Sequence, residues 1–75
     1  MKRYYDFFST TDNGEKEYFI FDVTQISFIR HNDSKGAHGE TSIYCGASQY
    51  NFSGRNNKTL YDEIRNIMRQ LEKGE

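Results

Sequence analysis

The chain has 75 residues, a formal net charge of −1 and one cysteine. A single cysteine excludes an internal disulfide, and the near-neutral charge does not favour a dedicated nucleic-acid binder. The length predicts one domain over residues 1–75. No segment has the pattern of a signal peptide or the length of a membrane span, and a free cysteine suits a reducing compartment. We therefore expect a cytoplasmic protein without a membrane partner.

The first predicted element is a hairpin with aromatic residues on both faces. Residues 3–9 and 17–23 predict two strands, and Asn13-Gly14 favours a two-residue turn between them. This register places Phe8 opposite Phe19. It assigns to the core face Tyr4, Phe8, Phe19, Phe21 and Val23, and to the opposite face Tyr5, Phe7, Tyr18 and Ile20. A shift of one residue would exchange the two faces.

A bend and a third strand follow the hairpin. Asp22 and Thr24 suit a bend near residues 23–25, and residues 26–31 predict the third strand. The next segment, 32–40, has two glycines and no apolar periodicity. It predicts a long loop, and loops of this kind often carry function.

The second hairpin has a clearer pattern than the first. Residues 41–45 and 48–52 alternate on either side of Gly46-Ala47, which suits a type II′ turn. This register pairs Ile43 with Tyr50 and Cys45 with Ser48. It directs Cys45 to the core and Tyr44 to the opposite face.

The last predicted element is an amphipathic helix from about residue 58 to residue 73. Its apolar positions recur at steps of three and four: Leu60, Ile64, Ile67, Met68 and Leu71. Asn57 or Thr59 suits the helix start. The chain therefore predicts an α+β fold, a five-stranded antiparallel meander with one C-terminal helix packed on one face. The predicted core joins the helix stripe to Phe8, Phe19, Phe21, Ile43, Tyr50 and Phe52.

No motif in the sequence predicts an enzyme, a metal site or a cofactor. Cys45, His31 and His38 could suggest thiol chemistry, but a cysteine that faces the core behaves as a small hydrophobe. Asp33 and the two histidines match no metal-binding spacing. The glycines at 36 and 39 precede a strand, whereas a phosphate loop enters a helix.

The aromatic residues opposite the helix predict the function. One helix covers one face of the sheet, so the other face predicts a partner surface or an oligomer interface. We expect a small protein-binding module, such as an inhibitor, adaptor or accessory protein, that binds a protein or a second copy of itself. The predicted contacts are Tyr5, Phe7, Tyr18, Ile20 and Tyr44. Richness in Lys, Asn, Ile, Phe and Tyr is typical of AT-rich genomes and suggests a phage or mobile element.

Two alternatives remain open at this stage. Outward rings together with Arg30, Lys35, Arg55 and Lys58 would suit a binder of single-stranded nucleic acid. A small ligand or nucleotide would instead use the 32–40 loop. The candidate ligand contacts are Arg30, Lys35, His38 and Arg55.

Overall fold

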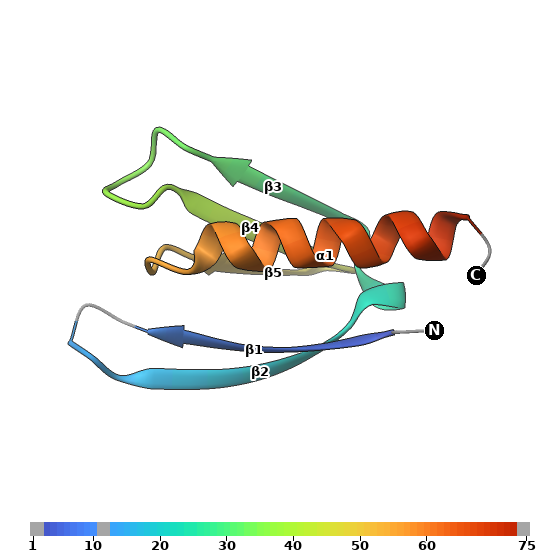
Figure 1. Cartoon of the computed structure of the whole chain (residues 1–75), viewed down its shortest axis with the longest axis horizontal. Helices are drawn as coiled ribbons and strands as arrows, with labels where there is room; N and C mark the ends of the chain where they lie inside the picture. Colours follow the sequence, from blue (N-terminus) through green and yellow to red (C-terminus); the bar gives the residue numbers. More distant parts are fainter. Residues whose placement is uncertain (1–2, 11–12, 74–75) are drawn as a thin grey trace.

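The computed structural model describes residues 3–10 and 13–73 and has the predicted α+β architecture (Figure 1). In chain order the elements are β1 (Tyr4–Thr10), β2 (Lys16–Asp22), the 3₁₀ turn η1 (Val23–Gln25), β3 (Phe28–Asn32), β4 (Glu40–Cys45), β5 (Ser48–Phe52) and α1 (Asn57–Glu72). Five antiparallel strands and one C-terminal helix are confirmed. The strands form two sheets instead of one meander, β1–β2 and β3–β4–β5.

The sheets separate at η1, where the sequence predicts a bend. The Asp22 carboxylate accepts hydrogen bonds from the Thr24 backbone N–H at 3.1 Å and the Thr24 hydroxyl at 2.6 Å. Val23, the first residue of the turn, is buried. The turn directs the chain away from β2, so β2 and β3 do not pair. The third strand was predicted to begin at residue 26, but β3 begins at Phe28.

The first hairpin is shifted by one residue from the predicted register. Phe7 pairs with Phe19, and Phe8 pairs with Tyr18. A type I′ turn requires positive φ at both central residues, but among the described residues only glycines have it, so Asn13 does not qualify. In the structure β1 ends at Thr10 and β2 begins at Lys16.

This shift exchanges the two faces of β1, as period-2 geometry requires, while Phe19 and Phe21 of β2 keep their predicted place at the core. The assignment of Tyr5 and Phe7 to the outer face is wrong: Phe7 is buried and Tyr5 is half-buried against the core. The assignment of Tyr4 and Phe8 to the core is also wrong, because both are exposed.

The second hairpin has the predicted register throughout. Cys45 pairs with Ser48, Ile43 with Tyr50 and Thr41 with Phe52. Gly46 has φ of 59°, and Ala47 does not have positive φ, as a type II′ turn requires. The alternation of apolar and polar residues in both strands and the short turn all favour the same register, so the sequence specifies this pairing.

The helix packs in front of the strands and closes the core (Figure 1). Its predicted stripe is confirmed: Leu60, Ile64 and Ile67 are buried, and Met68 and Leu71 pack against them half-buried. The strands, η1 and its C-cap residue contribute the remaining buried apolar residues, which are Phe7, Phe21, Val23, Ile26, Ile43 and Phe52. Tyr50, predicted in the core, is partly exposed at the edge strand β5.

Candidate functional site

Four large side chains form an exposed surface on the outward face of the β1–β2 hairpin. We call this surface the outer hairpin face and define it by Tyr4, Phe8, Tyr18 and Ile20. Their exposed fractions are 52%, 44%, 76% and 67%, respectively. They alternate with inward residues along both strands, and the rings of Phe8 and Tyr18 lie 6.2 Å apart.

Charged residues frame the outer hairpin face at both ends. At one end, Arg3 donates two hydrogen bonds to the Asp22 carboxylate, at 3.1 and 2.8 Å. These bonds, with those from Thr24, lower the pKa of Asp22 to about 2. At the other end, the Lys16 ammonium lies 5.6 Å from the Phe8 ring centre. The aromatic side chains are therefore exposed between fixed charges.

The five predicted contact residues do not share one surface. Tyr18 and Ile20 lie on the outer hairpin face, while Tyr5 and Phe7 face the core. Tyr44 lies on the outward face of the other sheet, where its ring centre is 4.5 Å from that of half-exposed Phe28. Sequence reasoning missed Tyr4 and Phe8, because only the register distinguishes them from their neighbours.

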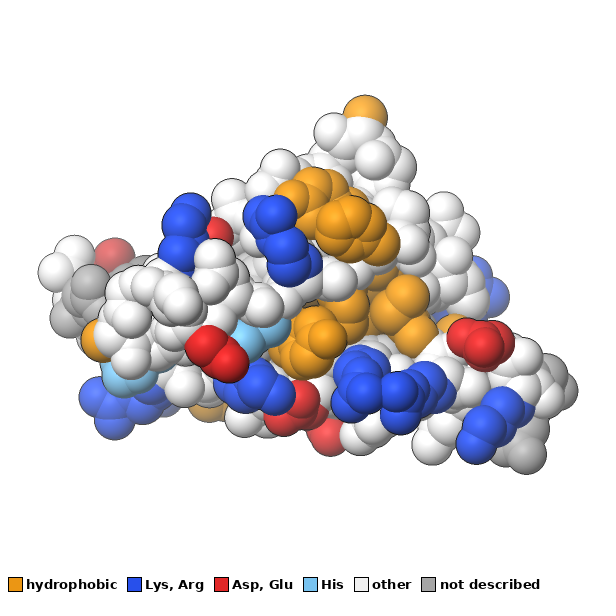
Figure 2. Space-filling model, turned by 90° about the horizontal axis from the view of Figure 1, so that it is seen from above, with side chains coloured by type: hydrophobic (Ala, Val, Ile, Leu, Met, Phe, Trp, Pro, Cys, Tyr) orange, Lys and Arg blue, Asp and Glu red, His pale blue; other side chains and the backbone are white. Residues whose placement is uncertain are grey.

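Figure 2 shows a hydrophobic patch on the side of β3, with Lys and Arg side chains beside it and along one border. Two of the lysines of the chain are ion-paired: Lys35 lies 3.4 Å from Glu40, and Lys58 lies 2.8 Å from Asp62.

The four predicted ligand contacts come from three parts of the chain, and Lys35 lies in the loop between β3 and β4. Arg30 pairs across the sheet with Ser42, on the outward face of β3, and Arg55 lies in the turn before α1. His38 is exposed in the loop.

A carboxylate, an imidazole and a hydroxyl form a chain at the base of the 32–40 loop. His31 Nε2 lies 2.8 Å from Asp33 Oδ1, and His31 Nδ1 lies 2.8 Å from Thr41 Oγ1. This is the order of groups in hydrolase triads. Thr41 is fully buried, however, and its hydroxyl donates to Asn57 at 2.8–2.9 Å. The hydroxyl is therefore inaccessible to a substrate, and the chain of bonds holds the loop.

Asn57 completes this network from the first turn of α1. Its side-chain amide donates to the backbone carbonyls of His38, Gly39 and Gly54, at 3.0, 3.2 and 2.8 Å. An asparagine at a helix start is typical of a capping residue, which is the only signal the sequence offers. The structure gives it another role, because Asn57 fixes the end of the loop against the helix. The N-cap position belongs to Asn56.

Cys45 has the environment of a packing residue. It is half-buried against the core, and burial raises the pKa of its thiol. A raised pKa lowers the fraction of reactive thiolate. In the part of the chain that the structure describes, no three His, Cys, Asp or Glu residues are grouped so that they could hold a metal ion.

Within that same described part, the one α-helix is too short and too polar to span a bilayer. Comparison with known proteins returned no matching family model, no matching curated protein and no matching solved structure.

Proposed function

We propose that this chain is a non-enzymatic protein-binding module that binds its partner through the outer hairpin face. The supporting observation is that four large side chains, Tyr4, Phe8, Tyr18 and Ile20, are all at least 44% exposed on one face of a two-stranded sheet. Single exposed rings are common on protein surfaces, but a joined patch is typical of an interaction site.

The composition of this face suits a protein partner. Tyr and Phe bury about 150–250 Å² each and often anchor interfaces. Asp6 lies on the same face opposite Ile20 and has no ion pair with any described residue. A matching partner would place apolar groups over the rings and a cation near Asp6.

A second copy of the chain is one such partner. A domain of this size without a disulfide or metal gains much from association. A different protein would use the same contacts, so the experiment below includes both cases.

The two alternatives have less support. A nucleic-acid platform needs free cations beside exposed rings, yet Lys35 and Lys58 are ion-paired and Tyr5 and Phe7 face inward. A ligand in the 32–40 loop would compete with Asn57, which already binds two carbonyls at the end of that loop.

The test substitutes the two tyrosines of the outer hairpin face. The Tyr4→Ser/Tyr18→Ser variant should keep its fold and weaken association by more than about 2 kcal/mol. The matched control, Phe28→Ser/Tyr44→Ser, removes two rings from the other sheet and should leave association unchanged. Sedimentation measures self-association, and titration with a captured partner measures heteromeric binding.

Site-specific photocrosslinking identifies the partner. A benzophenone side chain at position 18 should give an adduct with a second copy or with another protein, and the same group at exposed position 63 should not. Equal adducts at both positions, or unchanged association in the Tyr4→Ser/Tyr18→Ser variant, would contradict the proposal.

A further inference from the structure

An open groove runs between β2 and β5, on the inner side of the hairpin. One part is a hollow of about 430 Å³ between Glu17 and Phe19 of β2 and residues 49–54. A second hollow of about 230 Å³ extends it toward Cys45 and Gln25. Phe19 and Tyr50 line both hollows, so the groove follows the length of β5.

The backbone of β5 presents unpaired groups to this groove. In the two-residue hairpin, Cys45 and Ser48 form the closing hydrogen-bonded pair, so residues 48, 50 and 52 bond to β4. The Tyr44 carbonyl accepts from Ser27 N–H at 2.8 Å and thus points toward β3, as this alternation requires. The N–H and C=O groups of Gln49 and Asn51 therefore point away from β4, toward the free edge.

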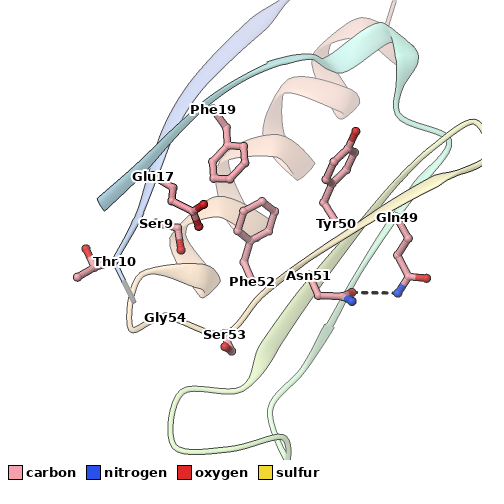
Figure 3. A pocket seen from close by; sticks show the side chains of 10 residues that line it. All are labelled: Ser9, Thr10, Glu17, Phe19, Gln49, Tyr50, Asn51, Phe52, Ser53 and Gly54. Atoms are coloured by element: carbon pink, nitrogen blue, oxygen red, sulfur yellow. Dashed lines mark hydrogen bonds between the residues drawn. The ribbon is translucent and has the colours of Figure 1, made fainter. Parts of the chain in front are cut away.

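The side chains at 49 and 51 leave this edge open. Gln49 donates to Asn51 Oδ1 at 2.9 Å, and Ser42 donates to the same oxygen at 2.8 Å. Figure 3 shows this pair directed away from the groove, whereas Glu17, Phe19 and Phe52 point into it. Residues 49 and 51 thus line the groove with their backbone.

The strand also lacks the usual protection of an exposed edge. Natural edge strands discourage pairing with charged residues, proline or a bulge. The β5 sequence Ser-Gln-Tyr-Asn-Phe contains no charge and no proline. The other edge of the same sheet, β3, carries Arg30 and His31.

We propose that the groove binds an extended peptide segment as a fourth strand of the β3–β4–β5 sheet. The peptide exchanges backbone hydrogen bonds with Gln49 and Asn51 of β5. It meets β2 through side chains, since Glu17 and Phe19 face it. This mode of recognition derives affinity from the backbone and specificity from alternate side chains.

The lining defines the chemistry of the peptide. Phe19, Tyr50 and Phe52 provide an aromatic surface for apolar residues at alternate positions. Glu17 makes no ion pair with a described residue, so its carboxylate favours a Lys or Arg at one end of the peptide. The expected ligand is an alternating segment with apolar side chains and a terminal cation.

Selection from a displayed library of random peptides of about seven residues tests the proposal. Peptides retained by the wild type should alternate apolar and polar residues and carry a Lys or Arg. Selected peptides should also slow alkylation of Cys45, which lines the far end of the groove. Failure to select any peptide, or selection without this pattern, would overturn the proposal.

Two substitutions at one position separate backbone from side-chain binding. Gln49→Pro removes the free N–H without breaking the ladder to β4, and proline is tolerated on edge strands. It should weaken a selected peptide about tenfold or more, whereas Gln49→Ala should change affinity by about twofold at most. If Gln49→Pro fails to fold, the wild-type protein can be tested with a modified peptide. N-methylation of the selected peptide at the amides that would pair with β5 removes its N–H donors and should weaken binding in the same way. Equal binding by the methylated peptide would refute strand addition.

A charge exchange tests the role of Glu17. Glu17→Lys should weaken binding of the cationic peptide about tenfold. The same variant should bind a peptide with Glu in place of that cation more tightly than the wild type does. Ile20 of the outer hairpin face borders the second hollow of the groove, but neither Tyr4 nor Tyr18 lines either hollow. The Tyr4→Ser/Tyr18→Ser variant should therefore bind these peptides normally, so the two proposals fail separately.

Discussion

Asn57 is the residue on which the 32–40 loop, β4 and the turn before α1 converge. It is fully buried, and removal of its side chain leaves the carbonyls of His38 and Gly39 without this donor, while the Gly54 carbonyl keeps its bond from the Asn57 backbone N–H. A buried polar group that loses its partner costs about 1–3 kcal/mol. Asn57→Ala should therefore lower the unfolding free energy by at least about 2 kcal/mol in urea. The exposed control Asn66→Ala, on the same helix, should change it by about 0.5 kcal/mol at most. Equal effects of the two would contradict this role.

The Arg3–Asp22 pair predicts a component of stability that depends on pH. Folding lowers the pKa of Asp22 from 3.8 to about 2. Because the folded-state pKa lies below the unfolded one, the contribution is complete above pH 3.8 and disappears as pH falls through about 2. Arg3→Gln should reduce stability at neutral pH and leave it unchanged below pH 2. Urea denaturation across this range measures the difference, and an NMR titration should show a higher Asp22 pKa in the variant. A constant difference at every pH would exclude ionisation of Asp22 as its cause.

Cys45 is predicted to be a packing residue. Its thiol should react with iodoacetamide more slowly in the folded protein than in urea, since burial raises its pKa and limits access. Cys45→Ala should retain the fold and the association through the outer hairpin face, which Cys45 does not contact. A reaction rate equal to that of the unfolded chain, with loss of binding in Cys45→Ala, would assign the thiol a functional role.

At the scale of elements, the helix stripe supplies the clearest stability prediction. Ile64 is fully buried between the helix and the strands. Ile64→Ala should cost about 2–5 kcal/mol through lost burial and the cavity left behind. Gln70→Ala, an exposed position on the same helix, should be nearly neutral in chemical denaturation. A loss below about 0.5 kcal/mol for Ile64→Ala would exclude the observed packing.

The same scale shows what could be predicted from sequence. Helix periodicity placed α1 within one or two residues, and the Gly46-Ala47 turn set the register of β4 and β5. The first hairpin was mispredicted because rings occupy both of its faces, so burial alone does not choose between the registers. The sequence signal for the register was the Asn13-Gly14 turn, and Asn13 lacks the positive φ that this turn needs. The candidate surface inherited this error, so Tyr18 and Ile20 were predicted on it and Tyr4 and Phe8 were not.

The groove was not predictable for a different reason. It exists because η1 directs β3 away from β2, which leaves β5 as an edge beside the hairpin. A single meander would have paired β2 with β3 and given no such arrangement. The placement of β5 beside the hairpin joins segments that are distant in the chain, and it has no local sequence signal. The anchoring of the loop by Asn57 has only a weak signal, an asparagine at a helix start.

At the scale of the whole molecule, the two sheets are joined by side chains. No backbone hydrogen bond links the described residues of β1 and β2 to the three-stranded sheet. Phe52 supplies much of the contact, with ring centres 5.5, 5.1 and 6.1 Å from Phe7, Phe19 and Phe21. The Asn56 side chain adds one hydrogen bond, to the Phe8 carbonyl at 2.7 Å.

This construction predicts unequal hydrogen exchange. Backbone amides of the β1–β2 hairpin should exchange with a smaller opening free energy than those of β4 and α1. The reason is that the hairpin can separate from the three-stranded sheet without breaking backbone hydrogen bonds between strands of the two sheets. Phe52→Leu should lower protection in the hairpin more than in α1. Uniform protection across both sheets, with uniform loss in the variant, would show that the domain opens only as a whole.

A hairpin held by side chains also creates thermodynamic linkage between its two faces. A ligand that contacts both the hairpin and β5 favours the state in which the hairpin is packed on the three-stranded sheet. A partner on the opposite side of the hairpin then meets more of that state, and its affinity changes if it binds the packed and separated states differently. Reciprocity then requires that each ligand change the affinity of the other by the same factor. If both proposed sites are occupied in the wild type, the absence of a backbone ladder between the described parts of the two sheets would link the two binding events within a single chain.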